Sequence, residues 1–318
     1  MALLMACAAF GQAPDPDVGG VRAGSLPRRW LTGGPNCMEV PDWQVHEYNP
    51  DLYILRESGC TNYEKPFLYL LFGAARVMLL DTGAGQTDVA REVNNVISKW
   101  LRHNQRDGIP LIVAHSHAHG DHVAGDSQFR EQPGATLVEP TLEATKRFFG
   151  IDRWPEGTGQ VDLGNRLIDV IPIPGHDALS LAYYDRQTGL LFTGDSLYPG
   201  RLYVSDLPAF VESTDRLVSF TRGKAIAHLL GCHIEQTATP YLDYPIGSMY
   251  QPDEHSLELA PADLLELQAA LHTMDKPRRI VMRDYTVWPV DAGEWKRLEQ
   301  VEKVTLERQT QSMWGKPR

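Results

Sequence analysis

Hydrophobic positions fall in short blocks along the first third of this chain, and turn-forming residues separate the blocks. Apolar or alternating runs predict β-strands at residues 43–48, 52–56, 67–72, 77–80 and 109–115. Between the last two strands, apolar residues recur at helical spacing from Val89 to Leu101, with Asp88 or Thr87 as a cap. Residues 86–101 are therefore expected to form an amphipathic helix that covers a sheet.

The alternation of strands and helices continues downstream. Strands are expected at residues 135–139, 166–174, 190–193 and 225–230, with a late strand at 278–288. Helices are expected at residues 141–149, 210–221 and 261–274, and a polar helix that frays into a tail begins at Trp295. Strands followed by interspersed helices predict an α/β protein in which two mixed sheets lie face to face with helices outside.

The domain organisation follows from composition. The 318 residues are 42% hydrophobic and 22% charged, which suits one large domain or two at most. We assign residues 43–290 to this domain, residues 14–42 to a Pro/Gly-rich N-terminal arm and residues 291–318 to a polar C-terminal helix and tail. Residues 1–13 are apolar and end in Gly11-Gln12-Ala13, so they resemble a signal peptide with a truncated n-region. This resemblance favours a periplasmic or secreted protein over a cytoplasmic one.

Charge and cysteines restrict the partners. The net charge of −11, with scattered Lys and Arg residues, argues against a nucleic-acid partner. After the N-terminus the sequence has no apolar run of 18 residues, so no membrane span is expected. Cys37 and Cys60 are expected to pair if the protein is exported, whereas Cys232 is expected to be a packed thiol. The partner is expected to be a small-molecule substrate, and the oligomeric state is left open.

Four metal-binding side chains follow the predicted strand at 109–115. They are His117, His119, Asp121 and His122. On an extended segment, side chains two positions apart point the same way, so His117 and His119 can bind one ion. A turn into a helix would direct Asp121 and His122 toward a second ion. Such a cluster without a metal would leave competing polar groups with few partners, so we expect a metal site.

Three further candidate ligands each follow a predicted strand and a glycine. They are His176 after Gly175, Asp195 after Gly194, and His233 after Gly231-Cys232. A two-metal hydrolytic site needs about three protein ligands per ion and a carboxylate that touches both, and these residues complete that set. His115 is expected to be a packed, hydrogen-bonded histidine, and His228 a structural one.

The motif set HxHxDH, Pro-Gly-His, Thr-Gly-Asp and a glycine-preceded His resembles the metallo-β-lactamase superfamily, over about residues 43–235. The upstream Leu79-Leu80-Asp81-Thr82-Gly83 is similar to the family's first motif. The resemblance implies a four-layer αβ/βα sandwich with the metals at one edge. It also implies that Asp81 braces the ligand loop. It assigns one ion to His117, His119 and His176, the other to Asp121, His122 and His233, and Asp195 to both.

The expected mechanism needs no Ser or Cys nucleophile. Two Zn²⁺ ions would activate a bridging hydroxide that attacks the carbonyl of a small ester, thioester or lactone, and the same ligands are compatible with Fe or Mn. Asp121 is the candidate catalytic residue that orients the water or moves its proton. Tyr198 and Tyr203 are candidate contacts to a developing oxyanion, with packing as the alternative for each. His255, in an aromatic stretch after His233, is a candidate substrate contact.

Other functions compete with this one. The ligand set with Asp195 resembles the glyoxalase II-like and lactonase-like branch, and zinc β-lactamases of the family usually carry Cys or Ser at that position. This departure argues against β-lactam hydrolysis without excluding it, so that activity is kept as the first alternative. The chain has no obvious basic cluster for a glutathione carboxylate, which argues against the glyoxalase assignment itself. An iron-dependent redox enzyme resembling a sulfur dioxygenase, or a non-catalytic metal-binding scaffold, would belong to other classes. The intact ligand set argues against the scaffold.

Overall fold

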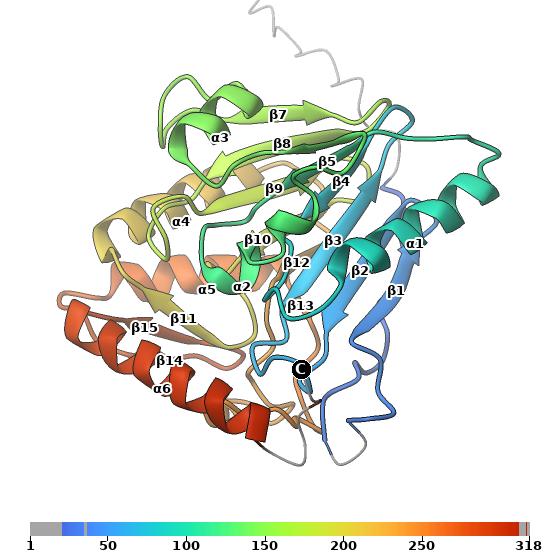
Figure 1. Ribbon diagram of the computed structural model, residues 1–318. Coiled ribbons are helices and arrows are strands. Elements are labelled where there is room, and N and C mark those ends of the chain that lie inside the picture. The colour runs from blue at the N-terminus through green and yellow to red at the C-terminus, as the bar shows by residue number, and fades with distance from the viewer. Residues whose placement is uncertain (1–20, 35–36, 312–315, 317–318) are drawn as a thin grey trace, which may run out of the picture.

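The computed structural model describes residues 21–34, 37–311 and 316 (Figure 1). The expected signal peptide at residues 1–13 lies outside the described residues, as does part of the N-terminal arm. Two six-stranded sheets and one three-stranded sheet make up the β structure described. In this part of the chain, no helix has both the length and the apolar composition to cross a bilayer.

The first sheet holds β1 to β6 in sequence order. Neighbouring strands run antiparallel from β1 to β4, and β4, β5 and β6 are parallel to one another. Its strands are short and four of them are buried along their whole length, as the apolar runs predicted. They are β1 Trp43–Asn49, β2 Leu52–Glu57, β3 Phe67–Phe72, β4 Val77–Leu80, β5 Leu111–Ala114 and β6 Ala135–Leu137.

The second sheet has the order β13-β12-β10-β9-β8-β7. Here β10 and β12 are parallel, and the other neighbouring pairs are antiparallel. The sequence predicted β8, β10 and β12 but not β7, β9 or the two-residue β13. The strands are β7 Gly159–Asp162, β8 Leu167–Pro172, β9 Leu181–Asp185, β10 Leu190–Gly194, β12 His228–Gly231 and β13 Glu258–Leu259.

The third sheet corrects the prediction of one late strand at residues 278–288. The segment forms two antiparallel strands, β14 Ile280–Val281 and β15 Thr286–Pro289, because the polar Arg283 and Asp284 lie in a turn that Met282 N closes onto Tyr285 O. The sheet is completed by β11, Arg201–Val204, which runs parallel to β15 and was not predicted.

The helices lie outside the two large sheets (Figure 1). Helix α1 is capped by the Asp88 side chain, as expected, and helix α4 begins three residues earlier than predicted because Asp206 caps it. The polar C-terminal segment forms a continuous helix. The helices are α1 Val89–His103, α2 Gly120–Val123, α3 Leu142–Phe149, α4 Leu207–Thr221, α5 Pro261–His272 and α6 Ala292–Gln311, with a 3₁₀ turn at Asp126–Gln128.

Three apolar clusters define the layers. The central cluster lies between the two large sheets and includes Ile54 and Tyr69 of the first and Val170 and Phe192 of the second. A second cluster packs α1 on the outer face of the first sheet, and a third packs α4 and α5 on the outer face of the second. The expected αβ/βα sandwich is confirmed.

Candidate metal centre

The seven candidate ligands meet at one edge of the sandwich. Each lies just after the carboxyl end of a strand or in the helix that follows, namely β5 and α2, β8, β10 and β12. Backbone hydrogen bonds join the loops across the two sheets, from Leu181 N to Ser116 O and from Phe67 N to Cys232 O. Residues separated by more than a hundred positions in sequence therefore share one site.

Two groups of potential ligand atoms match the expected assignment of the ligands to two ions. His117, His119 and His176 make one group, and Asp121, His122 and His233 make the other; within each group the ligand atoms lie within 4.8 Å of one another. His119 Nδ1 lies 3.0 Å from His176 Nε2, and His122 Nε2 lies 3.3 Å from His233 Nε2. Two nitrogens bound tetrahedrally to one zinc ion are about 3.4 Å apart, so these separations suit a shared ion.

Asp195 lies between the two groups. Its Oδ2 is 3.9 Å from His117 Nε2 and 3.8 Å from His176 Nε2 on one side. On the other side it is 3.6 Å from His122 Nε2 and 3.3 Å from His233 Nε2. A single carboxylate oxygen thus faces histidines of both groups, which is the position that a bridging ligand requires.

Four of the histidines have their outward ring nitrogen held by an oxygen atom. His117 Nδ1 lies 3.0 Å from Ser116 Oγ, and His122 Nδ1 lies 2.9 Å from Asp81 Oδ2. Backbone carbonyls hold the other two, at 2.8 Å from His176 Nδ1 to Tyr203 O and 2.9 Å from His233 Nδ1 to Glu64 O. An acceptor at Nδ1 fixes the N–H there and leaves Nε2 free to bind a metal.

Asp81 braces the loop that carries the first ligands. Its carboxylate accepts hydrogen bonds from Ser116 N and Ser116 Oγ, both at 2.7 Å, besides the contact with His122. The Cys232 Sγ lies 3.3 Å from the same carboxylate. Asp81 is fully buried, with a φ of 68°, a conformation that costs energy in a residue with a side chain. These hydrogen bonds hold Ser116 and His122, two residues of the loop and helix that carry the candidate ligands.

Two glycines let the ligand loops approach closely. Gly175 has a φ of 143°, and a Cβ there would lie 2.5 Å from Cα of Phe210 on α4. Gly194 has a φ of 52°, and its Cβ would lie 2.9 Å from that of Ser116. A side chain at either position would push His176 or Asp195 away from the His117 loop.

Burial and mutual charge shift the pKa values of the cluster. Burial, followed by the neighbouring His122, lowers the pKa of His117, and burial lowers that of His176 to about 4. These two rings are therefore neutral at pH 7, the form that binds metal. Burial opposes charge on Asp195 as well, but His233 and His122 outweigh it and hold the pKa of this carboxyl well below its usual range.

The donor set fits metal ions. Within the described chain, His117 Nε2 and Asp195 Oδ1 are buried without a hydrogen-bond partner. A buried polar atom without a partner costs roughly 1–3 kcal/mol, and a cation would satisfy both atoms. Imidazole and carboxylate ligands suit zinc, iron and manganese.

The other candidate residues have defined partners. His115 Nε2 bonds Asp126 Oδ1 at 2.9 Å, as predicted, while His228 lies half-buried at the start of β12. Cys232 is a buried thiol that also forms a potential metal-binding group with Asp81 and His122, so its role as a packed thiol rather than a ligand stays a prediction. The Tyr198 hydroxyl donates to Arg201 O and lies 3.1 Å from Glu235.

The remaining two substrate-contact candidates also have partners. The Tyr203 hydroxyl accepts from Arg201 Nε at 3.1 Å, and His255 Nε2 lies 3.3 Å from Asp284 Oδ1. For Tyr198, Tyr203 and His255, a contact with substrate stays a prediction.

Two neighbours of the centre were not predicted from the sequence. The Trp295 ring of α6 lies 5.8 Å from the His119 ring and 6.5 Å from that of His176, between centroids. The Glu64 carbonyl holds His233, as described above. A single tryptophan in a mostly polar helix was the only sign of the first neighbour, and a backbone acceptor leaves no sign in the sequence.

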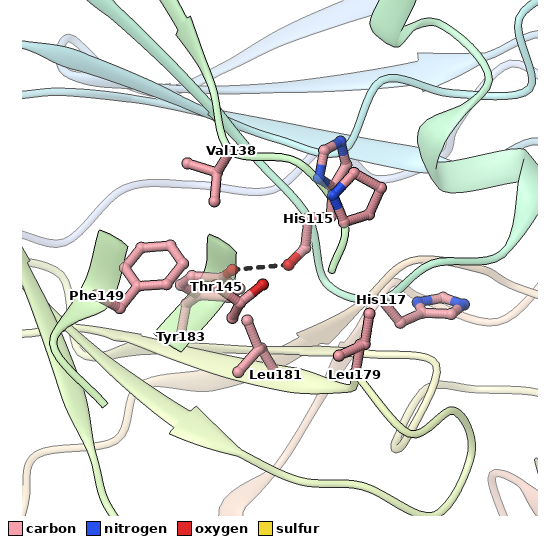
Figure 2. Close-up of a pocket in the computed structure, with 9 residues that line it drawn as sticks. His115, His117, Val138, Thr145, Phe149, Leu179, Leu181 and Tyr183 are labelled. Carbon is pink, nitrogen blue, oxygen red and sulfur yellow. Dashed lines mark hydrogen bonds between the residues drawn. The ribbon is translucent and has the colours of Figure 1, made fainter. Parts of the chain in front are cut away.

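A narrow apolar pocket adjoins the centre on the backbone side of His117 (Figure 2). The dashed bond in the figure joins the Tyr183 hydroxyl to the His115 carbonyl at 2.7 Å. The pocket lies between the segment after β5, which supplies His115 and His117, and β9, which supplies Leu181 and Tyr183. Its apolar lining includes Val138, Phe149, Leu179 and Leu181.

The αβ/βα sandwich and the histidine–aspartate cluster at its edge define a class of protein. Its members have two packed sheets and a candidate metal site at the ends of the strands. Within this class the chain belongs to the metallo-β-lactamase superfamily, whose family model matches residues 66–270.

Similar proteins agree with this membership. Over 112 residues the chain is 36% identical to hydroxyacylglutathione hydrolase of Chelativorans sp., covering 34% of this chain and 44% of that protein. The Rhizobium meliloti hydroxyacylglutathione hydrolase is 34% identical over 114 residues, which cover 35% of this chain and 44% of the relative. The chain thus spans less than half the length of these relatives. The solved structure of TMB-1 covers 74% of this chain and 99% of its own at a TM-score of 0.50; its 13% identity supports a shared fold alone.

Proposed function

We propose that this protein is a dinuclear zinc hydrolase that cleaves a small ester, thioester or lactone. The proposal rests on the convergence of seven candidate ligand side chains at one site, where Asp195 Oδ2 faces histidines of both groups. The Nδ1 atoms of His176 and His233 lie within hydrogen-bond distance of backbone carbonyl oxygens. Such outer acceptors are typical of metal-binding histidines.

Each ion would have its own three protein ligands. His117, His119 and His176 would hold one, Asp121, His122 and His233 the other, and Asp195 would contact both. Zinc is the metal we propose because it is common in His/Asp sites, and iron and manganese suit the same donors. When bound, a pair of divalent ions supplies a water of lowered pKa and polarises a carbonyl.

The chain's own residues would orient the reactants. The Asp121 side chain is more exposed than that of Asp195, the other acidic ligand, and lies 3.2 Å from both His122 Nε2 and His233 Nε2. Its carboxylate would therefore orient a water molecule at the second group. Trp295 and Tyr203 form an aromatic wall beside His119 and His176, with their ring centroids 5.9 Å apart. This wall would shield one side of the centre and would give an apolar substrate group a surface to contact.

Thioesters are the first substrate class to test. The curated relatives quoted above are named hydroxyacylglutathione hydrolases, which supports this order. Esters and lactones follow because they present the same carbonyl to the nucleophile. We propose that the partner of this protein is a small-molecule substrate and not a nucleic acid.

We also propose export to the periplasm or the medium. Cys37 and Cys60 form a disulfide in the described chain, and disulfides persist in oxidising compartments.

The decisive experiment is a panel of chromogenic thioesters, esters and lactones with a cephalosporin, assayed with zinc, with iron and after chelation. We expect turnover of at least one ester-type substrate, its loss on chelation, and about two zinc ions per chain by elemental analysis. Turnover that survives chelation would contradict the metal mechanism. Preference for the cephalosporin, or oxygen consumption by an iron-loaded enzyme, would favour the respective alternative.

A further inference from the structure

The orientation of His233 depends on a backbone carbonyl rather than on a side chain. Its Nδ1 lies 2.9 Å from Glu64 O, in the loop that joins β2 to β3. His122, in the same group, is held by the carboxylate of Asp81, which is fixed by several donors. The Glu64 carbonyl can hold the His233 ring only if the loop itself is fixed.

The loop is fixed by a residue near the end of α6. Gln309 is 4% exposed, and its side chain makes two hydrogen bonds to the loop backbone. Its Nε2 donates to Gly59 O at 2.9 Å, and its Oε1 accepts from Tyr63 N at 3.1 Å. One amide side chain thus bridges the two ends of the segment that immediately precedes Glu64.

Other contacts hold the same segment from outside. The Cys37–Cys60 disulfide joins it to the N-terminal arm, and Lys316 N donates to Cys60 O at 3.1 Å. Lys65, the residue after Glu64, is buried, and its Nζ donates to Ser248 O at 2.9 Å. Among these described contacts, Gln309 alone joins both ends of the segment.

Loss of the Gln309 amide would leave two buried backbone groups unpaired. Each such group costs about 1–3 kcal/mol, so the loop would shift to reach water or another partner. A shift of the loop would carry Glu64 O away from His233 Nδ1. Outer partners of this kind change metal affinity by about 10- to 100-fold when they are lost.

We propose that Gln309 is a positioning residue for His233, acting through the loop from Gly59 to Glu64. Gln309 touches none of the candidate ligands in the described contacts. Its effect would be confined to the ligand group formed by Asp121, His122 and His233. This inference rests on the proposed function, because it assigns His233 to a metal ion.

The test uses Gln309→Met, which conserves volume and removes both hydrogen bonds, with Gln300→Met on the exposed face of α6 as the matched control. The first readout is solvent exchange of the His233 Nδ1 proton by NMR, in metal-free and zinc-loaded protein. We expect faster exchange in Gln309→Met, with the His176 Nδ1 proton, held by Tyr203 O, unchanged. The second is zinc affinity by chelator competition, where we expect about 10- to 100-fold weaker binding of one of two ions.

Wild-type exchange and wild-type affinity in a folded Gln309→Met protein would overturn the inference. A wild-type protein that binds no zinc would overturn the proposed function instead, and the exchange measurement in metal-free protein would still decide the role of Gln309. If Gln309→Met does not fold, the test uses Gln309→Glu, which retains the acceptor for Tyr63 N and removes the donor to Gly59 O. We expect it to show intermediate exchange, and wild-type exchange in that variant would also refute the inference.

Discussion

At the scale of single residues, buried polar groups in this protein differ in how fully they are paired. Asp81 accepts from Ser116 N, Ser116 Oγ and His122 Nδ1. Glu57, equally buried, accepts from two neutral donors among the described residues, Ala84 N at 3.0 Å and Thr61 Oγ1 at 3.2 Å. Burial raises the pKa of Glu57 to about 7. Glu57 is therefore a source of pH-dependent stability.

We predict that Glu57→Gln removes part of the pH dependence of unfolding. Because the pKa of Glu57 is higher in the folded chain than its ordinary 4.5, the folded state binds the proton more tightly. The stability that this proton provides is present below pH 4.5 and is lost as the pH rises through about 7. From pH 5 to pH 8 the variant should gain on the order of 3 kcal/mol over the wild type.

Urea denaturation at the two pH values measures this difference. Glu131→Gln, at an exposed position, is the control. Its free energy of unfolding should differ little from that of the wild type at both pH values. An equal stability difference between Glu57→Gln and wild type at pH 5 and pH 8 would contradict the prediction.

At the scale of elements, helix α6 is part of the wall of the centre. Its first turn contributes Trp295, whose Nε1 donates to Ser205 Oγ at 2.9 Å, and Ser205 Oγ in turn donates to the carbonyl of His176. Its last turn contributes Gln309. The sequence predicted a polar helix from Trp295 but gave no reason to place it here, because its contacts are with residues roughly a hundred or more positions away.

We predict that Trp295→Ala lowers kcat/KM about tenfold while zinc content stays at the wild-type level. The ring borders the centre without being a metal ligand, so its loss removes apolar contact with the substrate. Steady-state kinetics with the best panel substrate and elemental analysis measure both effects. Trp295→Phe retains a ring and should lose less activity; a loss of zinc in Trp295→Ala would show that the ring acts on the ligands instead.

At the scale of the whole molecule, the N-terminal arm and the C-terminus both attach to the loop after β2. Cys60 of this loop is bonded to Cys37, and Lys316 N donates to its carbonyl. A cross-link stabilises a fold mainly by restricting the unfolded chain. The disulfide therefore serves the stability of the entire domain as well as the loop.

We predict that the double substitution Cys37→Ser and Cys60→Ser lowers the free energy of unfolding by about 3 kcal/mol. The sequence separation of the two cysteines is 23 residues, which gives a closed loop of intermediate length. Denaturant unfolding with and without reductant measures the loss. Reductant should destabilise the wild type and leave the double variant unchanged, and an equal response of both would show that no disulfide forms in solution.

Local sequence patterns were enough to predict the strands of the first sheet, helix α1 and the candidate ligands. Buried strands are local apolar runs, and the ligands His117 to His122 are neighbours in sequence whose spacing follows strand and turn geometry. His176, Asp195 and His233 were found because each follows a strand end and a glycine. Tertiary structure alone decided the third sheet, the place of Trp295 and Gln309, and the carbonyls of Glu64 and Tyr203 that hold the ligand rings. These features depend on backbone groups, which every residue carries alike, and on contacts between distant segments, which no local pattern encodes.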